Sequence, residues 1–257
     1  MTFFLIKKSF FDMWDNMITV FLVNLGFVLI AAAALYIPYL LSFSTPLAVL
    51  GAAIGVILFN VYTAAASFIA RDIANYTTAS IKEMVAYFKE TWKAGVALGI
   101  VTVVQIAVLV VAMPFYFRMG GIVGMGAVSI IFWISVIWWL ASQYYFGVRA
   151  RLDSDVKKLF KKSFILLFDN TMFSIALAIG TIVIFAISAF TAFLLPGITT
   201  ILIWHQGATK IRLLKYDYLE KNPEANRKEI PWDALLIDEK DRVGQRTLRG
   251  MIFPWKE

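Results

Sequence analysis

Long apolar segments without a carboxylate are the feature that most restricts what this chain can fold into. Six such segments occur along the 257 residues, at about residues 18–41, 46–70, 95–117, 122–147, 171–195 and 197–214. A helix of about 20 apolar residues is long enough to cross the hydrocarbon core of a bilayer. Hydrophobic side chains make up 60% of the chain, more than in an ordinary soluble domain. The sequence therefore predicts an all-α integral membrane protein.

The sixth segment is the weakest of these predictions. Only Ile198–Trp204 is strongly apolar, and His205, Gln206 and Lys210 follow closely. A helix from Gly197 to Arg212 would rise about 22 Å, less than the hydrocarbon thickness of about 30 Å. Such a helix must be surrounded by the other spans, cross a thinned bilayer, or begin earlier.

The distribution of charge favours six spans over five. If the N-terminus is cytoplasmic, Arg118 is the only one of 24 Lys and Arg residues on the outer side, and all 17 acidic residues are inside. Basic residues beside spans stay on the cytoplasmic side. With five spans the basic tail would face outward. We therefore expect an N-in, C-in, multi-pass protein of the cell inner (cytoplasmic) membrane, with Arg118 at the outer interface or against an extracytoplasmic partner.

A short element is repeated along the chain. Residues 6–16 and 160–170 share Lys-Lys-Ser-Phe and a terminal Asp-Asn without a gap, and residues 88–93 form a looser copy. Each copy precedes an odd-numbered span. The sequence thus predicts three two-helix quasi-repeats, each led by a cytoplasmic amphipathic helix, with Asp-Asn capping the following span.

The domain prediction follows from these repeats. The six-span domain covers residues 1–215, with repeats at about 3–75, 77–151 and 154–215, and the cytoplasmic tail covers 216–257. Basic and aromatic residues of the three amphipathic helices form a collar beside the membrane, which either anchors to anionic lipid or docks a partner. The residues expected to make such contacts are Lys7, Lys8, Trp14, Lys89, Trp92, Lys93, Lys161, Lys162, Phe164, Arg249, Phe253 and Trp255.

Five amide side chains fall within the predicted spans: Asn24, Asn60, Gln105, Gln143 and Gln206. Hydrogen bonding between helices is the ordinary role of such residues in a membrane protein. The alternative is that they line a polar path for an uncharged solute. Gly51 and Gly55 have the spacing of a close helix contact, which is a weak signal by itself.

Several function classes are disfavoured. The chain has no Cys and one His, His205, which excludes thiolate chemistry and zinc sites built from Cys. No catalytic motif is present, so we expect no catalytic residue, metal site or cofactor, and no enzyme activity. The basic residues flank spans instead of forming a nucleic-acid-binding stripe. The absence of Asp and Glu from the spans argues against proton- or cation-coupled transport.

One resemblance adds to this. The aromatic and basic lead-in, Trp92 and Lys93 at the third span, and Lys-Lys-Ser-Phe before Asp169-Asn170 resemble the YesL-like family of bacterial membrane proteins, to which no activity is assigned. The resemblance covers about residues 1–215. It implies a bacterial cytoplasmic-membrane protein encoded near carbohydrate ABC uptake systems, and it supplies no site residues.

Three hypotheses follow for function. The first is a non-enzymatic accessory or scaffold subunit of a bacterial membrane assembly, linked to carbohydrate ABC uptake, which docks ABC transporter subunits or other membrane proteins through its collar and tail. The second is a facilitative path or channel for a small neutral solute. The third is a lipid-binding membrane protein.

Overall fold

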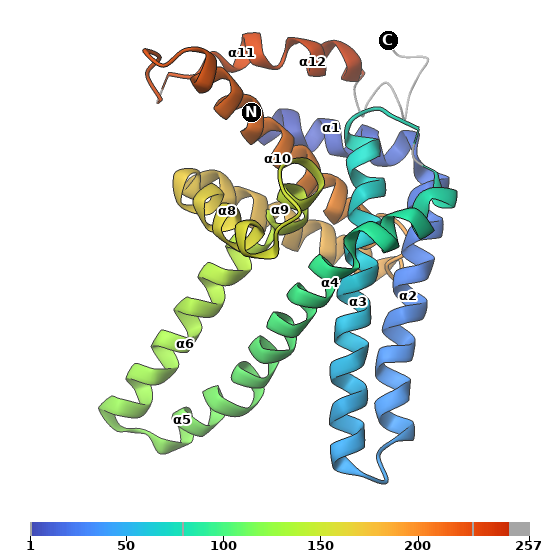
Figure 1. Cartoon of the computed structure of the whole chain (residues 1–257), viewed down its shortest axis with the longest axis vertical. Helices are drawn as coiled ribbons and strands as arrows, with labels where there is room; N and C mark the ends of the chain where they lie inside the picture. Colours follow the sequence, from blue (N-terminus) through green and yellow to red (C-terminus); the bar gives the residue numbers. More distant parts are fainter. Residues whose placement is uncertain (1, 79, 228, 247–257) are drawn as a thin grey trace.

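The structure is a computed structural model that describes residues 2–78, 80–227 and 229–246. Within these ranges the chain is helical, with no strand (Figure 1). The main helices are α1 (Thr2–Asp15), α2 (Met17–Leu40), α3 (Thr45–Ala74), α4 (Met84–Ala107), α5 (Met113–Met119), α6 (Gly121–Ser142), α7 (Tyr145–Arg151), α8 (Val156–Asp169), α9 (Thr171–Phe190) and α10 (Gly197–Lys221). Shorter elements are η1 (Ile81–Glu83), the π-helical turn η2 (Val108–Ala112), α11 (Trp232–Leu235) and α12 (Ile237–Val243).

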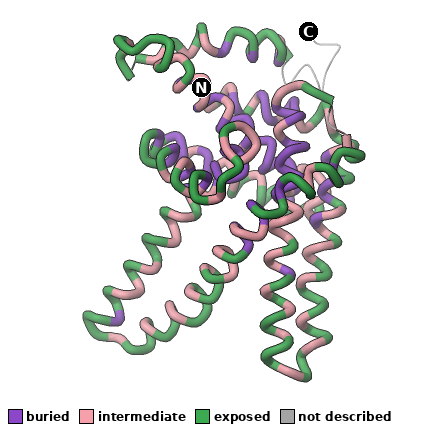
Figure 2. Tube along the Cα trace, in the orientation of Figure 1, coloured by how far each residue is buried: buried purple, intermediate pink, exposed green. Residues whose placement is uncertain are grey.

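Five helical segments of the described chain are long and apolar enough to cross a membrane: Met17–Leu40, Thr45–Ala74, Ile81–Met119, Gly121–Arg151 and Thr171–Phe190. Their side chains are largely exposed on the outside of the molecule (Figure 2). In the segment that contains α6, only 6% of the most apolar window is buried. Exposing this much apolar surface to water would be very unfavourable, which fits a multi-pass membrane protein surrounded by lipid.

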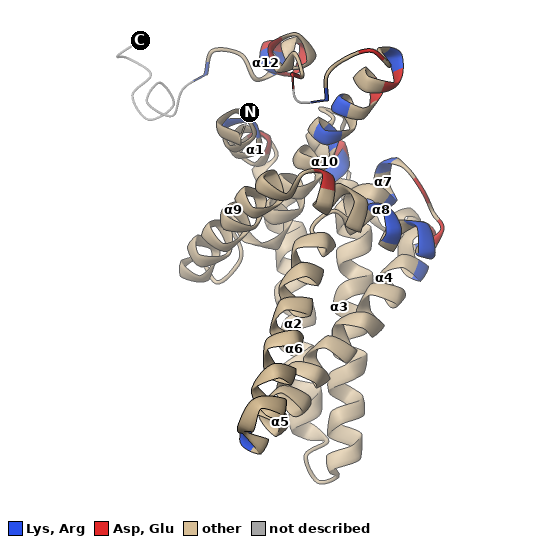
Figure 3. Cartoon of the chain, turned by 90° about the vertical axis from the view of Figure 1, so that its left-hand side faces the viewer, with Lys and Arg blue, Asp and Glu red and all other residues tan. Residues whose placement is uncertain are grey.

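The long helices form hairpins that spread away from a common base. The α2/α3 hairpin and the hairpin of α4, α5 and α6 diverge from each other, and α9 with α10 forms a shorter third arm (Figure 1). Helices α1, α7, α8 and α12 lie at the base. Lys, Arg, Asp and Glu gather at this charged end, whereas Arg118 of α5 lies at the far tips (Figure 3). Charge thus separates along the long axis as the sequence predicts.

Helix α10 is the centre of the fold and lies against α1, α2, α3, α7 and α9. Most of its side chains from Gly197 to Arg212 are buried. Trp204 fills the space above Gly180 and donates its indole N–H to the Leu177 carbonyl at 2.9 Å. Helix α10 is not one of the five apolar segments. Its modest hydropathy has a physical reason, because its neighbours in the fold are other helices.

Two predicted helix boundaries are wrong. The amphipathic helix expected to lead the second repeat, with its copy of the repeated element at 88–93, is not a separate helix: the turn η1 is followed by α4, which runs unbroken into the third apolar segment, since no Pro separates the two parts. The predicted span 122–147 lies within the apolar segment Gly121–Arg151, but it is not one continuous helix, because α6 ends at Ser142 and α7 begins at Tyr145. At this break the Tyr144 hydroxyl pairs with Ser174 at 2.7 Å, and the Tyr145 hydroxyl donates to the Ala94 carbonyl at 3.2 Å.

The predicted Asp-Asn caps are also wrong. Asn16 and Asn170 occupy the N-cap positions of α2 and α9, but neither side chain makes a capping hydrogen bond. Each side-chain amide instead donates back to the carbonyl four residues earlier, Asn16 to Asp12 at 2.9 Å and Asn170 to Leu166 at 3.1 Å. The backbone carbonyls of the two asparagines accept from the new helix. The amides therefore finish the amphipathic helix and do not cap the next one.

Candidate functional site

A cleft of about 640 Å³ lies between the diverging hairpins, beneath α10. Its walls come from α2, α3 and α4 on one side and from the end of α6 on the other, and α10 with Phe146 forms the roof. The polar residues that line it are Asn60, Thr63, Thr102, Gln105, Ser142, Gln143 and His205. The remaining lining side chains are aliphatic or aromatic, with Trp138 and Trp139 on the α6 side.

The hydroxyls and amides of the walls are only partly satisfied. Thr63 and Thr102 each donate to a carbonyl one turn earlier in their own helix, and the Asn60 amide donates to the Val56 carbonyl at 2.9 Å. Their oxygens keep free acceptor positions. The Gln105 side chain makes no hydrogen bond with any residue in the described ranges. The α3/α4 wall therefore presents unused polar groups to the cleft.

The roof carries a connected polar chain. His205 Nε2 and Thr181 Oγ1 are 2.9 Å apart, and Thr181 lies 3.4 Å from Gln143 Oε1. Gln143 also donates to the Leu140 carbonyl at 3.2 Å. These contacts link α9 and α10 to the break between α6 and α7. His205 is not among the five predicted amide side chains, and its position one residue before Gln206 in the same apolar segment is the sequence signal for it.

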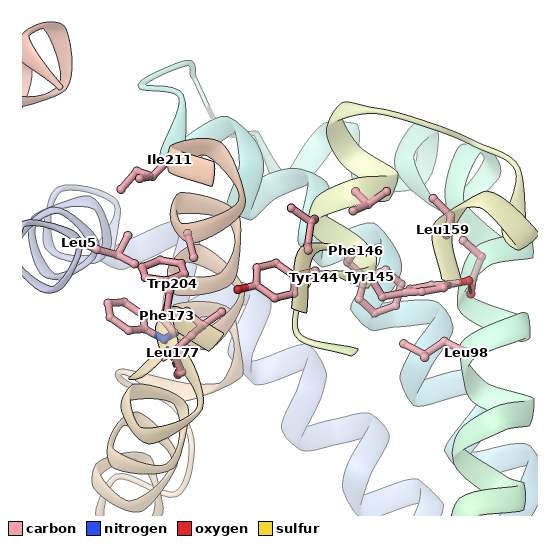
Figure 4. Packing of buried hydrophobic residues seen from close by; sticks show 14 of the residues in the cluster. Leu5, Leu98, Tyr144, Tyr145, Phe146, Leu159, Phe173, Leu177, Trp204 and Ile211 are labelled. Carbon is pink, nitrogen blue, oxygen red and sulfur yellow. Dashed lines mark hydrogen bonds between the residues drawn. The ribbon is translucent and has the colours of Figure 1, made fainter. Parts of the chain in front are cut away.

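Aromatic packing closes the cleft toward the charged end. Tyr144, Tyr145, Phe146 and Trp204 belong to one buried cluster that also contains Leu177 (Figure 4). The side chains of Tyr144 and Tyr145 are fully buried. Phe146 both lines the cleft and belongs to this cluster, so aromatic packing borders the cleft on that side.

Two of the five predicted amides do not face the cleft. Asn24 donates to the Leu194 and Pro196 carbonyls at 2.9 and 2.8 Å and accepts from the Thr199 N–H and hydroxyl at 2.8 and 2.7 Å. Gln206 donates to the carbonyls of Ser67 and Phe146 at 3.1 and 3.3 Å. Both are buried connectors between helices. The structure therefore brings Asn60, Gln105 and Gln143 together and gives Asn24 and Gln206 a structural role.

The tail lies on α1 at the charged end. Lys7 donates to the Gly244 carbonyl at 3.0 Å, and Asp15 accepts from Arg246 at 2.8 and 3.0 Å. Arg246 also stacks over Phe11 at 4.5 Å. Leu236 and Val243 of the tail are buried. Residues 232–246 thus form an ordered strap on the amphipathic helix, and α10 continues past residue 215 to Lys221.

A buried ionic cluster lies beneath this strap. Lys8 contacts Asp12 at 2.8 Å and Glu239 at 3.4 Å, donates to the Ala74 carbonyl at 3.0 Å, and lies over the Tyr76 ring. Burial raises the pKa of Asp12 to about 6, against the lowering effect of Lys8. Burial would also raise the pKa of Glu239, but Lys210 and Lys8 hold it below its ordinary value.

The other predicted contact residues are spread over the charged end. Trp14, Lys89, Trp92, Lys93 and Lys161 are exposed. Lys162 pairs with Asp153 at 3.2 Å, and Phe164 packs against Trp138. Lys8 is buried against Asp12 and the Ala74 carbonyl, and the partly buried Lys7 donates to the tail at Gly244. The predicted contacts at Arg249, Phe253 and Trp255 lie outside the described residues.

The polar groups of the cleft are all uncharged side chains or an imidazole. Amides, hydroxyls and one imidazole line it, and the described carboxylates lie at the charged end (Figure 3). In the described part of the chain, no group of three or more His, Asp or Glu residues could hold a metal ion. No family model, curated protein or solved structure matches this chain. The resemblance to the YesL-like family therefore stays a prediction.

Proposed function

We propose that this protein is a non-enzymatic accessory subunit of a membrane assembly, and that the cleft between its hairpins holds a transmembrane helix of a partner. The observation that carries this is the hairpin of α4, α5 and α6. Beyond its close contact with α3 at Gly95 and Gly99, α4 diverges from α2/α3, and the gap that opens is lined by Asn60 of α3 and by Thr102 and Gln105 of α4.

Lipid is a poor occupant of such a gap. Acyl chains offer no hydrogen bond to an amide, and an unsatisfied polar group in hydrocarbon is costly. A helix with small and polar residues on one face can satisfy these groups, and each such bond contributes about 0.6–2 kcal/mol. The broad apolar surface of α6 offers the remaining contact area.

The proposal includes the six-span, N-in, C-in topology with three quasi-repeats. Helix α10 would be the sixth span, surrounded by the other helices and therefore free to be less apolar. The support is that α1 and α12 lie at the same charged end (Figure 1), as an even number of crossings requires. The shared back-bonding of Asn16 and Asn170 supports the equivalence of the first and third repeats. The bacterial inner membrane and the link to carbohydrate ABC uptake rest on the family resemblance alone.

Site-specific photocrosslinking in native membranes tests the helix-binding role. A photoreactive residue at Gln105 and another at Ser142 would probe opposite walls of the cleft, with Ile130, an exposed α6 residue outside the cleft, as the control. We expect both cleft positions to capture a transmembrane segment of the same protein, and Ile130 to capture lipid. Capture of lipid alone from both walls would contradict the proposal.

Binding of a small neutral solute is the second candidate, and the size of the cleft favours it. A volume of about 640 Å³ lies within the range of small-molecule sites, which combine apolar walls with a few polar groups. A facilitative path would also require the aromatic layer of Tyr144, Tyr145 and Phe146 to open. Flux of glycerol and of monosaccharides into proteoliposomes tests this candidate. We expect Gln105→Leu to lower the flux. Asn24 is not replaced in this experiment, because its role in the fold is structural. Equal flux in empty liposomes would remove this candidate.

A further inference from the structure

A second pocket, of about 330 Å³, lies at the charged end where α3, α7 and α10 meet. Three cationic side chains line it: Arg71, Arg151 and Lys210. Asn75 and Asp217 are the other polar residues of the lining. The pocket is separate from the intramembrane cleft, so what binds here is independent of the proposed helix-binding role.

Two of the three cations have carboxylate partners that fix their position. Arg71 contacts Asp72 at 2.7 Å and lies over the Phe68 ring at 4.4 Å. Lys210 contacts Glu239 at 2.5 Å. Their charges are therefore largely balanced, and their side chains are held in place before any ligand arrives.

Arg151 differs from these two, because no carboxylate of the described residues forms an ion pair with it. Its Nη1 donates to Asn75 Oδ1 at 2.9 Å, and its Nη2 donates to the Gln206 carbonyl at 3.5 Å. Its Nε is buried and has no hydrogen-bond partner in the described structure. Asp217 lies at the exposed side of the pocket and forms no ion pair with a described residue.

A guanidinium with a buried, unused N–H and no counter-ion is costly to fold into a protein. An anion that enters the pocket would supply the direct ion-pair partner that Arg151 lacks among the described residues. Guanidinium groups match the oxygens of phosphate in a fork geometry, and a nearby Lys adds a point charge. A phosphate group with a few attached atoms fits the available volume.

We propose that Arg151, with Lys210 and Arg71, forms a binding site for a phosphate-bearing anion at the charged end of the molecule. The phosphate comes either from an anionic phospholipid headgroup or from a soluble phosphate ester. Arg151 makes the principal contact, and Leu213 and Leu214 border the site with apolar surface that suits the rest of the ligand.

The test uses the full chain in neutral detergent and in phosphatidylcholine nanodiscs, with two ligand arms. In the first, native mass spectrometry measures retention of phosphatidylglycerol by the detergent-solubilised protein. In the second, calorimetry measures binding of glycerol 3-phosphate to the protein in nanodiscs. We expect saturable binding in at least one arm, and the arm that responds identifies the source of the phosphate.

Two variants of α7 separate this site from general attraction of anions. Arg151→Gln should weaken binding about tenfold or more. Arg149→Gln removes the same charge two residues away, where Arg149 contacts Glu90 and does not line the pocket, so it should bind as the natural chain does. Arg151→Lys keeps the charge and should retain weaker binding, which guards against misfolding of the Gln variant.

Two results would reject the phosphate site. Equal weakening in Arg149→Gln and Arg151→Gln would reduce the effect to net charge and reject the site. Absence of saturable binding in both arms would reject a phosphate ligand and leave an acidic protein segment as the partner of Arg151.

Discussion

At the scale of single residues, the amide side chains divide into two groups with different tasks. Asn24 has four hydrogen bonds to the α9–α10 turn and the start of α10, whereas Gln105 has none among the described residues and faces the cleft. The turn between α9 and α10 packs against the Asn24 side chain. Gly197 has a φ of +69°, and a Cβ there would overlap the Asn24 amide, so only glycine fits.

Replacing Asn24 with Leu should destabilise the fold. It would leave the Leu194 carbonyl and the N–H and hydroxyl of Thr199 without the Asn24 amide, while the Pro196 carbonyl keeps the Thr200 hydroxyl, a loss on the order of 3 kcal/mol. The midpoint of thermal unfolding in detergent measures it. Asn60→Leu is the matched control, since Asn60 bonds only to its own helix at Val56, and it should unfold near the natural midpoint. An equal decrease of the unfolding midpoint in both variants would contradict the division of the amides into structural and cleft-facing groups.

The buried carboxyl of Asp12 should make stability depend on pH. Its pKa rises from 3.8 to about 6 on folding, so the folded state binds the proton more tightly and stability falls as pH rises through this interval. The full difference corresponds to about 3 kcal/mol. The groups that face Asp12 are Lys8, Glu239 and Lys210.

Thermal unfolding from about pH 7.5 to about pH 5 checks this dependence. We expect the natural chain to become more stable toward the acidic end and Asp12→Asn to lose that gain. A variant that keeps the full pH slope would assign it to another group.

At the scale of elements, the contact between α3 and α4 depends on two glycines four residues apart. A Cβ on Gly95 would lie 2.6 Å from the Val61 Cα, and a Cβ on Gly99 would lie 2.8 Å from the Ile57 Cα. Small residues at this spacing let helix backbones approach closely in membranes. The more evident pair in the sequence, Gly51 and Gly55, meets α2 instead, with Gly55 against Ala34.

Gly95→Leu should therefore separate α4 from α3 and lower stability by about 1–3 kcal/mol or more through overpacking. Gly126→Leu is the matched control, because a Cβ at Gly126 meets nothing within 4 Å. Unfolding midpoints in detergent compare the two. Comparable losses at Gly95 and Gly126 would show that the close contact is not what sustains the hairpin pair.

At the scale of the whole molecule, the separation of charge along the long axis makes a direct prediction about orientation. The chain has no Cys, so each introduced thiol is unique. Arg118→Cys, at the hairpin tips, should react with a membrane-impermeant maleimide in intact cells. Lys157→Cys, exposed on α8 at the charged end, should react only after permeabilisation. Labelling of both from the same side would reject the proposed topology.

The sequence alone predicts the properties that depend on composition and local order. Apolar length predicts which segments are long enough to cross a membrane, and the distribution of Lys and Arg predicts which ends carry the charge. Five of the six predicted spans correspond to helical segments long and apolar enough to cross a membrane, and the sixth, in α10, does not. The Asp-Asn caps show the limit of such reasoning, because local sequence cannot tell whether Asn16 bonds forward or back to Asp12.

Only the tertiary structure decided which residues meet across large separations in the chain. The partners of Asn24 lie more than 160 residues away, and Lys8 meets Glu239 of the tail. The central position of α10 is of the same kind. The mean hydropathy of α10 is low for a membrane-spanning helix. A helix that faces lipid needs apolar side chains, whereas α10 is covered by five other helices and can carry more polar ones. The cleft and the Arg151 pocket form where neighbouring helices diverge. Their existence therefore depends on how the helices pack together and cannot be read from any one segment.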